Sequence, residues 1–429
     1  MSSALGIIFL ALMSVGVPVA IALSAAPIIG FVLAEKATFL NIIPQKLIGG
    51  INQFPLLAIP LFILAGEVMN KGGVTLRLIA VANVFVGHFR AGLAQVNIAT
   101  SLLFAGLSGS AVADTSALGS MMIPAMEKEG YTRKFSAAVT AASSIIGPII
   151  PPSIMMVIYA FVMQVSVGGL FLAGLVPGIL MGVLLMIVTH LSANRKDLPP
   201  ARPSAPLPEK IHALRDGVLP LLSPIIVLAG IVGGVFTPTE AAAVVLVYTL
   251  FISIFVMKTM ALRDVPSVLV RGVSQSSSIL YIIAAGSLFA WAIALSGAPR
   301  ELAKLVFSGF ENPLAVLLML NIFLLLVGMI LDAGPAVLIV GPLIAPAVLQ
   351  YGIDPLHLAV ITCINLSVGL ATPPMGLVLF VAGSISRENI FAICREMLPY
   401  YAAHVAVIIL TTYFPAISMT LPRLVGFAD

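Results

Sequence analysis

Long apolar runs separated by short polar segments follow one another along most of the chain. A membrane-spanning helix needs about 20 apolar residues. Runs of roughly that length cover the ranges 4–33, 51–70, 76–88 with its flanks, 134–162, 168–192, 216–235, 238–258, 274–296, 356–384 and 398–421. Membrane β-barrels show alternating segments of only about 10 residues, and lipid tolerates no other backbone structure than helices and closed barrels. The pattern therefore predicts an all-α polytopic membrane protein.

Two further apolar stretches, 91–129 and 313–349, are too long for one crossing and are interrupted by small residues. We expect each to form a re-entrant hairpin of two half-helices. The first run, 4–33, has no basic segment before it and no convincing cleavage site, so it is expected to be a retained helix and not a signal peptide.

Composition agrees with this class. Of the 429 residues, 60% are apolar and 9% are charged, whereas soluble domains average about 45–50% and about 25%. Soluble enzymes are thereby excluded, and the sequence has no Walker A motif through which ATP would drive it. The net charge of +4 reports membrane orientation and predicts no nucleic-acid binding.

The longest polar stretch, 193–216, contains five prolines between Pro199 and Pro208. Its basic residues are Arg195, Lys196, Arg202, Lys210 and Arg215. Because basic residues gather in cytoplasmic loops, we interpret this stretch as a cytoplasmic linker between two halves.

The two halves contain a repeat at a fixed offset of 222 positions, which aligns 106–177 with 328–399 without a gap. Glycine and proline pairs match most clearly: Gly106/Gly328, Gly119/Gly341, Pro124/Pro346, Gly130/Gly352, Gly147/Gly369, Pro151/Pro373, Pro152/Pro374 and Pro177/Pro399. Five predicted crossings separate the units, so the second is expected to be inverted in the membrane, as in secondary transporters. An old duplication retained only for packing is the alternative.

Each unit also has a helix interrupted by two prolines, after Gly147 in the first and after Gly369 in the second. A proline removes an amide donor and frees carbonyls near the break. Such carbonyls, with Ser, Thr or Asn oxygens, form a cage suited to Na⁺, while half-helix N-termini attract an anion. Two cation sites flanking one anionic substrate are expected. A simple proline kink is the alternative.

Acidic residues inside apolar segments are costly and usually face a cavity, a partner or an ion. Asp114 follows Ser110 by one helical turn, and Asp332 occupies the repeat position of Ser110. We expect both aspartates near the cation and substrate sites, together with Ser143 and Asn365; helix capping is the alternative for the aspartates. Two other acids are interpreted as structural, Glu67 near an interface and Glu240 at the start of a helix.

Four segments resemble the large membrane subunit (the DctM component) of TRAP, or tripartite ATP-independent periplasmic, transporters. They are Gly106-Leu107-Ser108-Gly109-Ser110-Ala111-Val112-Ala113-Asp114, Gly147-Pro148-Ile149-Ile150-Pro151-Pro152-Ser153, Gly234-Val235-Phe236-Thr237-Pro238-Thr239-Glu240-Ala241 and Gly369-Leu370-Ala371-Thr372-Pro373-Pro374. The resemblance covers nearly the whole chain and implies a transporter of the bacterial inner membrane, not an enzyme.

The resemblance also implies two Na⁺ sites. The first would use Ser108, Ser110, Gly147, Ile150 and Pro152, and the second Gly369, Thr372 and Met375. It further implies an elevator mechanism, a separate small four-helix membrane subunit, and a periplasmic substrate-binding protein. That protein would deliver a C4-dicarboxylate, a sialic acid or a related sugar acid for Na⁺-coupled import.

The resulting domain division has six parts. They are scaffold helices over 1–90, a first transport repeat over 91–192, the linker over 193–216, central scaffold helices over 217–310, a second transport repeat over 311–397 and a C-terminal helix over 398–429. Two other functions stay open at this point: a stand-alone Na⁺- or H⁺-coupled carboxylate carrier, and a channel or non-transporting membrane scaffold.

Overall fold

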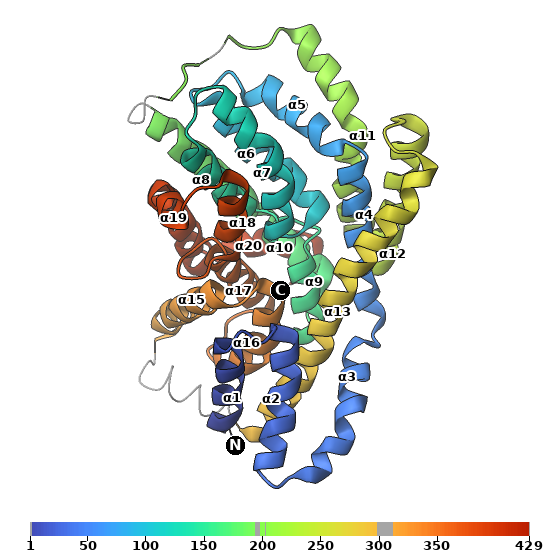
Figure 1. Ribbon diagram of the computed structural model, residues 1–429, viewed down its shortest axis with the longest axis vertical. Helices are drawn as coiled ribbons and strands as arrows, with labels where there is room; N and C mark the ends of the chain where they lie inside the picture. Colours follow the sequence, from blue (N-terminus) through green and yellow to red (C-terminus); the bar gives the residue numbers. More distant parts are fainter. Residues whose placement is uncertain (1, 194–197, 202, 298–311, 429) are drawn as a thin grey trace.

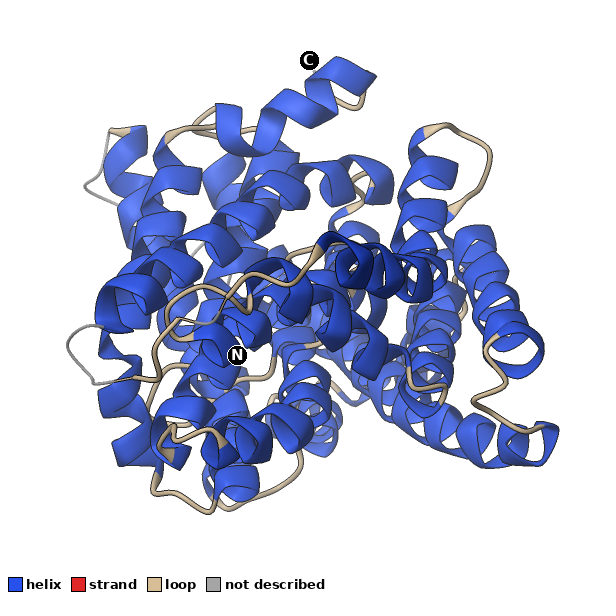
Figure 2. Ribbon diagram, turned by 90° about the horizontal axis from the view of Figure 1, so that it is seen from above, coloured by secondary structure: helices blue, strands red, loops and turns tan. Residues whose placement is uncertain are grey.

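The computed structural model describes residues 2–193, 198–201, 203–297 and 312–428. Within these ranges the chain consists of helices and connecting loops, with no β-strand (Figures 1 and 2). The predicted all-helical class is therefore confirmed.

The N-terminal part forms short helices, the longest of which has 15 residues. They are α1 (Ser2–Ser14), α2 (Val19–Leu33), η1 (Ala37–Ile42), α3 (Ile43–Ile51), η2 (Phe54–Leu57), α4 (Ala58–Lys71) and α5 (Val74–Val86). The run over 4–33 was expected to be one span, and this is wrong. Gly16 adopts a left-handed φ of 85°, and Pro18 stands at the N-cap of α2, so the chain turns back and α2 packs against α1.

The first repeat contains α6 (Gly92–Ser108), α7 (Ala111–Lys128), α8 (Arg133–Ser144), α9 (Ile154–Met163) and α10 (Val167–Ala193). The second contains α15 (Pro313–Ile330), α16 (Ala333–Leu349), α17 (Pro355–Gly369), α18 (Leu377–Ser386) and α19 (Ile390–Tyr413), and α20 (Ala416–Val425) follows. The run over 398–421 was also expected to be one span; instead it is divided between α19 and α20 at Pro415, which has no amide proton to continue a helix.

The central part contains α11 (Leu207–Val232), α12 (Pro238–Phe251), the short π-helix η3 (Ile252–Val256), η4 (Leu262–Asp264) and α13 (Val265–Ser296). Because α11 begins at Leu207 after Pro206, the linker predicted over 193–216 is shorter than expected. Three of its basic residues, at positions 195, 196 and 202, lie outside the described residues.

Seven helical segments in the described part of the chain are long and apolar enough to cross a membrane. They are Phe54–Lys71, Val167–Ala193, Leu207–Val232, Pro238–Val256, Leu262–Ser296, Pro313–Ile330 and Ile390–Tyr413. Many large apolar side chains on them are exposed, for example Val247 at 66% and Leu326 at 53%. Such faces suit lipid, and the chain is a multi-pass membrane protein.

Equivalent helices of the two repeats make equivalent contacts. α6 packs against α8 as α15 packs against α17. In addition, α18 of the second repeat packs against α7 of the first, and α9 of the first repeat packs against α16 of the second. The repeats are thus interleaved, and the two interrupted helices meet the hairpins of both units near the middle of the molecule (Figure 1).

Candidate functional site

The first helix break lies between α8 and α9, over residues 145–153. Ser153 is the N-cap of α9: its hydroxyl accepts a hydrogen bond from the Met156 amide at 3.2 Å and donates one to the Pro148 carbonyl at 2.6 Å. One hydroxyl thus closes the unwound segment and begins the next helix. The peptide bond between Pro151 and Pro152 is cis.

Asp114 lies against this break with a carboxylate that is only half satisfied. Its side chain is fully buried. The Ser108 hydroxyl donates to Oδ1, and Oδ2 has no hydrogen-bond partner among the described residues. A methyl group added to Gly147 would overlap Oδ2. Glycine at position 147 therefore allows the Asp114 carboxylate to lie directly against the backbone of the break. An unpaired buried carboxylate oxygen is costly unless a proton or a cation accompanies it.

The tip of the first hairpin approaches the same break. Gly109 adopts a left-handed φ of 63°, and a methyl group there would lie 2.7 Å from the Pro152 carbonyl oxygen. The Ser108 hydroxyl also accepts the Ser110 amide at 3.2 Å. The hairpin tip therefore contacts the break at Pro152, and its Ser108 hydroxyl also binds the Asp114 carboxylate.

The second break, between α17 and α18, is also closely packed. A methyl group on Gly369 would overlap the Gly328 backbone, and one on Gly328 would lie 2.8 Å from the Leu366 carbonyl oxygen. The Gly376 amide donates to the Met329 carbonyl at 3.4 Å. The Thr372 hydroxyl donates to the Val368 carbonyl at 2.8 Å, which leaves its oxygen lone pairs available.

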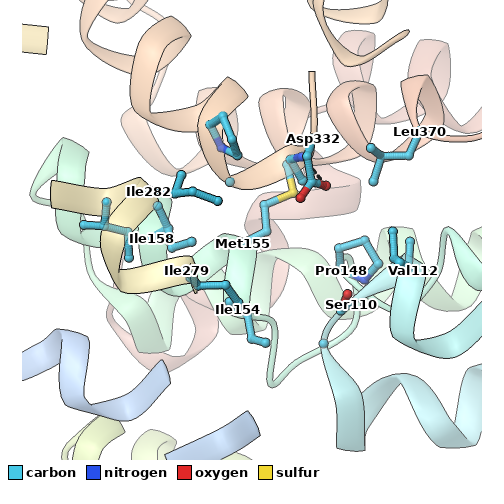
Figure 3. Close-up of a pocket in the computed structure, with 16 residues that line it drawn as sticks. Ser110, Val112, Pro148, Ile154, Met155, Ile158, Ile279, Ile282, Asp332 and Leu370 are labelled. Carbon is cyan, nitrogen blue, oxygen red and sulfur yellow. Dashed lines mark hydrogen bonds between the residues drawn. The ribbon is translucent and has the colours of Figure 1, made fainter. Parts of the chain in front are cut away.

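A cavity of about 80 Å³ lies between the two hairpin tips. Figure 3 shows Ser110 from one hairpin and Asp332 from the other facing this space. Both begin helices: Ser110 caps α7, and Asp332 caps α16 by accepting the Ala333 amide at 2.8 Å. The capping interpretation of Asp332 is therefore confirmed, and the same carboxylate also lines the cavity.

The start of α9 contributes Ile154 to the cavity, so three helix N-termini converge on it. Helix N-termini carry amide donors and a partial positive charge, which favour an anion. The opposite wall is aliphatic and comes from α13, which contributes Ile279, Ile282 and Ile283. The cavity therefore has helix N-termini and polar side chains on one side and an aliphatic wall on the other.

A comparison with known protein families identifies the family of this chain. The sequence matches the family described as "Tripartite ATP-independent periplasmic transporter, DctM component" over residues 6–417. The chain belongs to this family. Its members are transporter permeases and not enzymes.

Two relatives and one solved structure illustrate the similarity. The chain is 40% identical over 383 residues to the C4-dicarboxylate TRAP transporter large permease protein DctM of Pseudomonas aeruginosa, covering 89% of this chain and 90% of that protein. It is 36% identical over 416 residues to the sialic acid TRAP transporter large permease protein SiaM of Vibrio cholerae, covering 97% of each. The YdaH transporter of Alcanivorax borkumensis has a similar fold, with a TM-score of 0.65 at 16% identity over 90% of each chain.

The residues expected from the TRAP resemblance are brought together only in part. Ser108, Gly147 and Pro152 lie around Asp114 and the first hairpin tip. The Ile150 side chain packs against Gly178 of α10, and the carbonyl is the one atom through which Ile150 could bind a cation. In the second set Gly369 is buried and Met375 is 45% exposed; both were expected to contribute backbone carbonyls.

Ser143 and Asn365 occupy equivalent repeat positions and lie between helices. The Ser101 hydroxyl of α6 donates to Ser143 Oγ at 2.8 Å, and the Asn365 amide of α17 donates to Asn321 Oδ1 of α15 at 2.7 Å. Each contact joins a hairpin to the first half of an interrupted helix. In this structure their hydrogen bonds connect helices, and neither residue lines the cavity.

Two structural predictions about acids can be checked directly. Glu240 forms a capping box with Thr237 at the start of α12, as expected. Glu67 accepts from Gln275 at 3.1 Å and lies 3.6 Å from Arg271, so it joins α4 to α13.

The sequence did not identify Ile279, Ile282 and Ile283 of α13 as residues that line the cavity. Isoleucine is common in apolar helices, and no pattern in the sequence distinguishes these three from their neighbours.

Proposed function

We propose that this TRAP family chain is the large permease of a Na⁺-coupled importer of organic acids, working by an elevator mechanism. The observation that carries the proposal is the buried Asp114 carboxylate, whose Oδ2 faces Gly147 without a hydrogen-bond partner in the described part of the protein. A proton or a monovalent cation balances such a group, and the carbonyls of an unwound segment suit Na⁺.

The first cation site would be formed by Asp114, the Ser108 and Ser110 hydroxyls, and carbonyls of the break at Gly147, Ile150 or Pro152. The second would use the repeat-equivalent break, with carbonyls at Gly369 and Met375 and the Thr372 hydroxyl. The close packing of Gly369 on Gly328 supports this second site, because it holds the second hairpin against the break, where the helix between α17 and α18 is interrupted.

The substrate would lie in the cavity between Ser110 and Asp332. Asp332 alone would repel an acid, whereas a cation bound at each break offsets the acidic side chains and leaves the helix N-termini to attract a carboxylate. Relatives named for C4-dicarboxylate and sialic acid transport support an organic acid as cargo.

In the elevator mechanism, the hairpins and interrupted helices would move as a transport domain against α4, α11, α12 and α13. The aliphatic α13 wall supports such sliding, because apolar contacts are non-directional and leave no hydrogen bonds to break. The two hairpins would then be re-entrant and inverted relative to each other, with access alternating across the bacterial inner membrane.

Membership of the TRAP family supports two protein partners: a small four-helix membrane subunit and a periplasmic substrate-binding protein. The test is uptake of labelled succinate and sialic acid into proteoliposomes containing this chain and its small subunit. Uptake that requires both an inward Na⁺ gradient and the binding protein would support the proposal.

Three other results would each overturn part of the proposed function. Uptake without the binding protein would indicate a stand-alone carrier. Uptake driven by a pH gradient with K⁺ in place of Na⁺ would assign a proton to Asp114. Na⁺ conductance without coupled substrate movement would indicate a channel.

A further inference from the structure

One helix outside both proposed cation sites forms a hydrogen bond beside each helix break. α19 packs against α8 and against α17, the two helix halves that end at the breaks. Two side chains of α19, Tyr401 and His404, point towards the breaks. They are three residues apart and therefore lie on one face of the helix, with ring centroids 6.4 Å from each other.

Tyr401 reaches the second break. Its hydroxyl donates to the Ala371 carbonyl at 2.8 Å. Ala371 lies between Leu370, which lines the substrate cavity, and Thr372 of the proposed second cation site. α17 ends at Gly369, so this carbonyl lies beyond the helix and takes its partner from α19.

His404 reaches the end of α8. Its Nε2 lies 3.2 Å from the Ala142 carbonyl oxygen, and because a carbonyl only accepts, Nε2 must carry the proton. Inside a helix Ala142 would accept from the Ile146 amide, but that amide donates to Ser143 at 3.1 Å instead. His404 is fully buried, and its Nδ1 has no hydrogen-bond partner within the described ranges.

We propose that Tyr401 and His404 are positioning residues that couple the two cation sites through α19. The inference rests on the proposed Na⁺ coupling and adds the route by which the sites communicate. Ordering of one break by a cation fixes α19, and α19 then holds the other break in its binding geometry. The second cation therefore binds with less loss of conformational freedom, which is positive cooperativity.

The test is a Na⁺ titration of thermal stability on the full purified chain, with K⁺ holding ionic strength constant. The wild type should give a Hill coefficient above one. Tyr401→Phe should lower the Hill coefficient towards one. It should also raise the half-saturating Na⁺ concentration by about fivefold, a size typical of the loss of one hydrogen bond. His404→Phe should act in the same direction.

Tyr400→Phe is the matched control. Tyr400 is the neighbouring tyrosine, is 1% exposed, and its hydroxyl lies 3.1 Å from Thr189 Oγ1 of α10, away from both breaks. This variant loses the same atom and should keep the wild-type Hill coefficient. Equal titrations for Tyr401→Phe and Tyr400→Phe, or a wild-type Hill coefficient of one, would overturn the coupling.

A second comparison separates coupling from simple destabilisation. In a Thr372→Val background the second site is weakened, so Tyr401→Phe should shift the remaining Na⁺ titration much less than it does in the wild type. An undiminished shift would refute the coupling while leaving Na⁺ binding intact. A wild type that responds equally to Na⁺ and K⁺ would instead refute the proposed function itself.

Discussion

Ser110 and Asp332 occupy equivalent positions of the two repeats, each begins the second helix of a hairpin, and both line one cavity. The two halves of the chain therefore place different side chains at the same structural position. One half offers a hydroxyl and the other a carboxylate, so the cavity is chemically asymmetric although the backbone is repeated.

Removal of the Asp114 charge should weaken Na⁺ binding at the first site. We expect Asp114→Asn to raise the half-saturating Na⁺ concentration by about tenfold, the equivalent of about 1.4 kcal/mol. Without Na⁺ the variant should be as stable as the wild type or more stable, because a buried unpaired charge is gone.

Thermal unfolding over a Na⁺ series measures both effects. Glu127→Gln is the control, since Glu127 forms an exposed ion pair with Arg133. An unchanged Na⁺ response in Asp114→Asn would exclude this carboxylate from the site.

Loss of the Thr372 hydroxyl should weaken the second site. Thr372→Val should lower uptake at limiting Na⁺ and leave folding largely intact, because only a local bond to the Val368 carbonyl is lost. Thr420→Val is the control: its hydroxyl makes the same type of bond, to the Ala416 carbonyl one turn earlier inside α20. If both variants show the same Na⁺ dependence, Thr372 is not a ligand.

A methyl group at Gly369 should disrupt the contact between the second hairpin and the second break. Gly369→Ala is expected to cost about 1–3 kcal/mol of stability, since the added atom meets the Gly328 backbone, which cannot rotate away. Gly6→Ala is the control, because nothing lies within 4 Å of the added carbon. Comparable unfolding temperatures for the two variants would contradict the packing.

Movement of α9 against α13 is required by the elevator mechanism. Ile158 and Ile282 line the same cavity from these two helices. We expect an Ile158→Cys/Ile282→Cys variant, made with Cys363 and Cys394 replaced by Ala, to lose uptake on oxidation and regain it on reduction. The two single-cysteine variants should be unaffected. Full uptake by the cross-linked protein would exclude relative motion at this contact.

The sequence alone predicted the features that depend on local chemistry and on periodicity. Apolar runs of spanning length identified a helical membrane protein. Two prolines after Gly147 and after Gly369 predicted the interruptions that separate α8 from α9 and α17 from α18, because each proline lacks the amide proton that an interior helical position donates. The Thr237 and Glu240 capping box was equally local.

The tertiary structure decided what lies against those breaks. The contact of Asp114 with Gly147 joins α7 to the unwound segment between α8 and α9, and no spacing in the sequence encodes it. The same holds for the α13 wall and for Tyr401, whose partner Ala371 is chosen by how α19 packs. Local rules fix where carbonyls are freed, but only packing between distant segments determines which of them meet a hydroxyl, a carboxylate or a substrate.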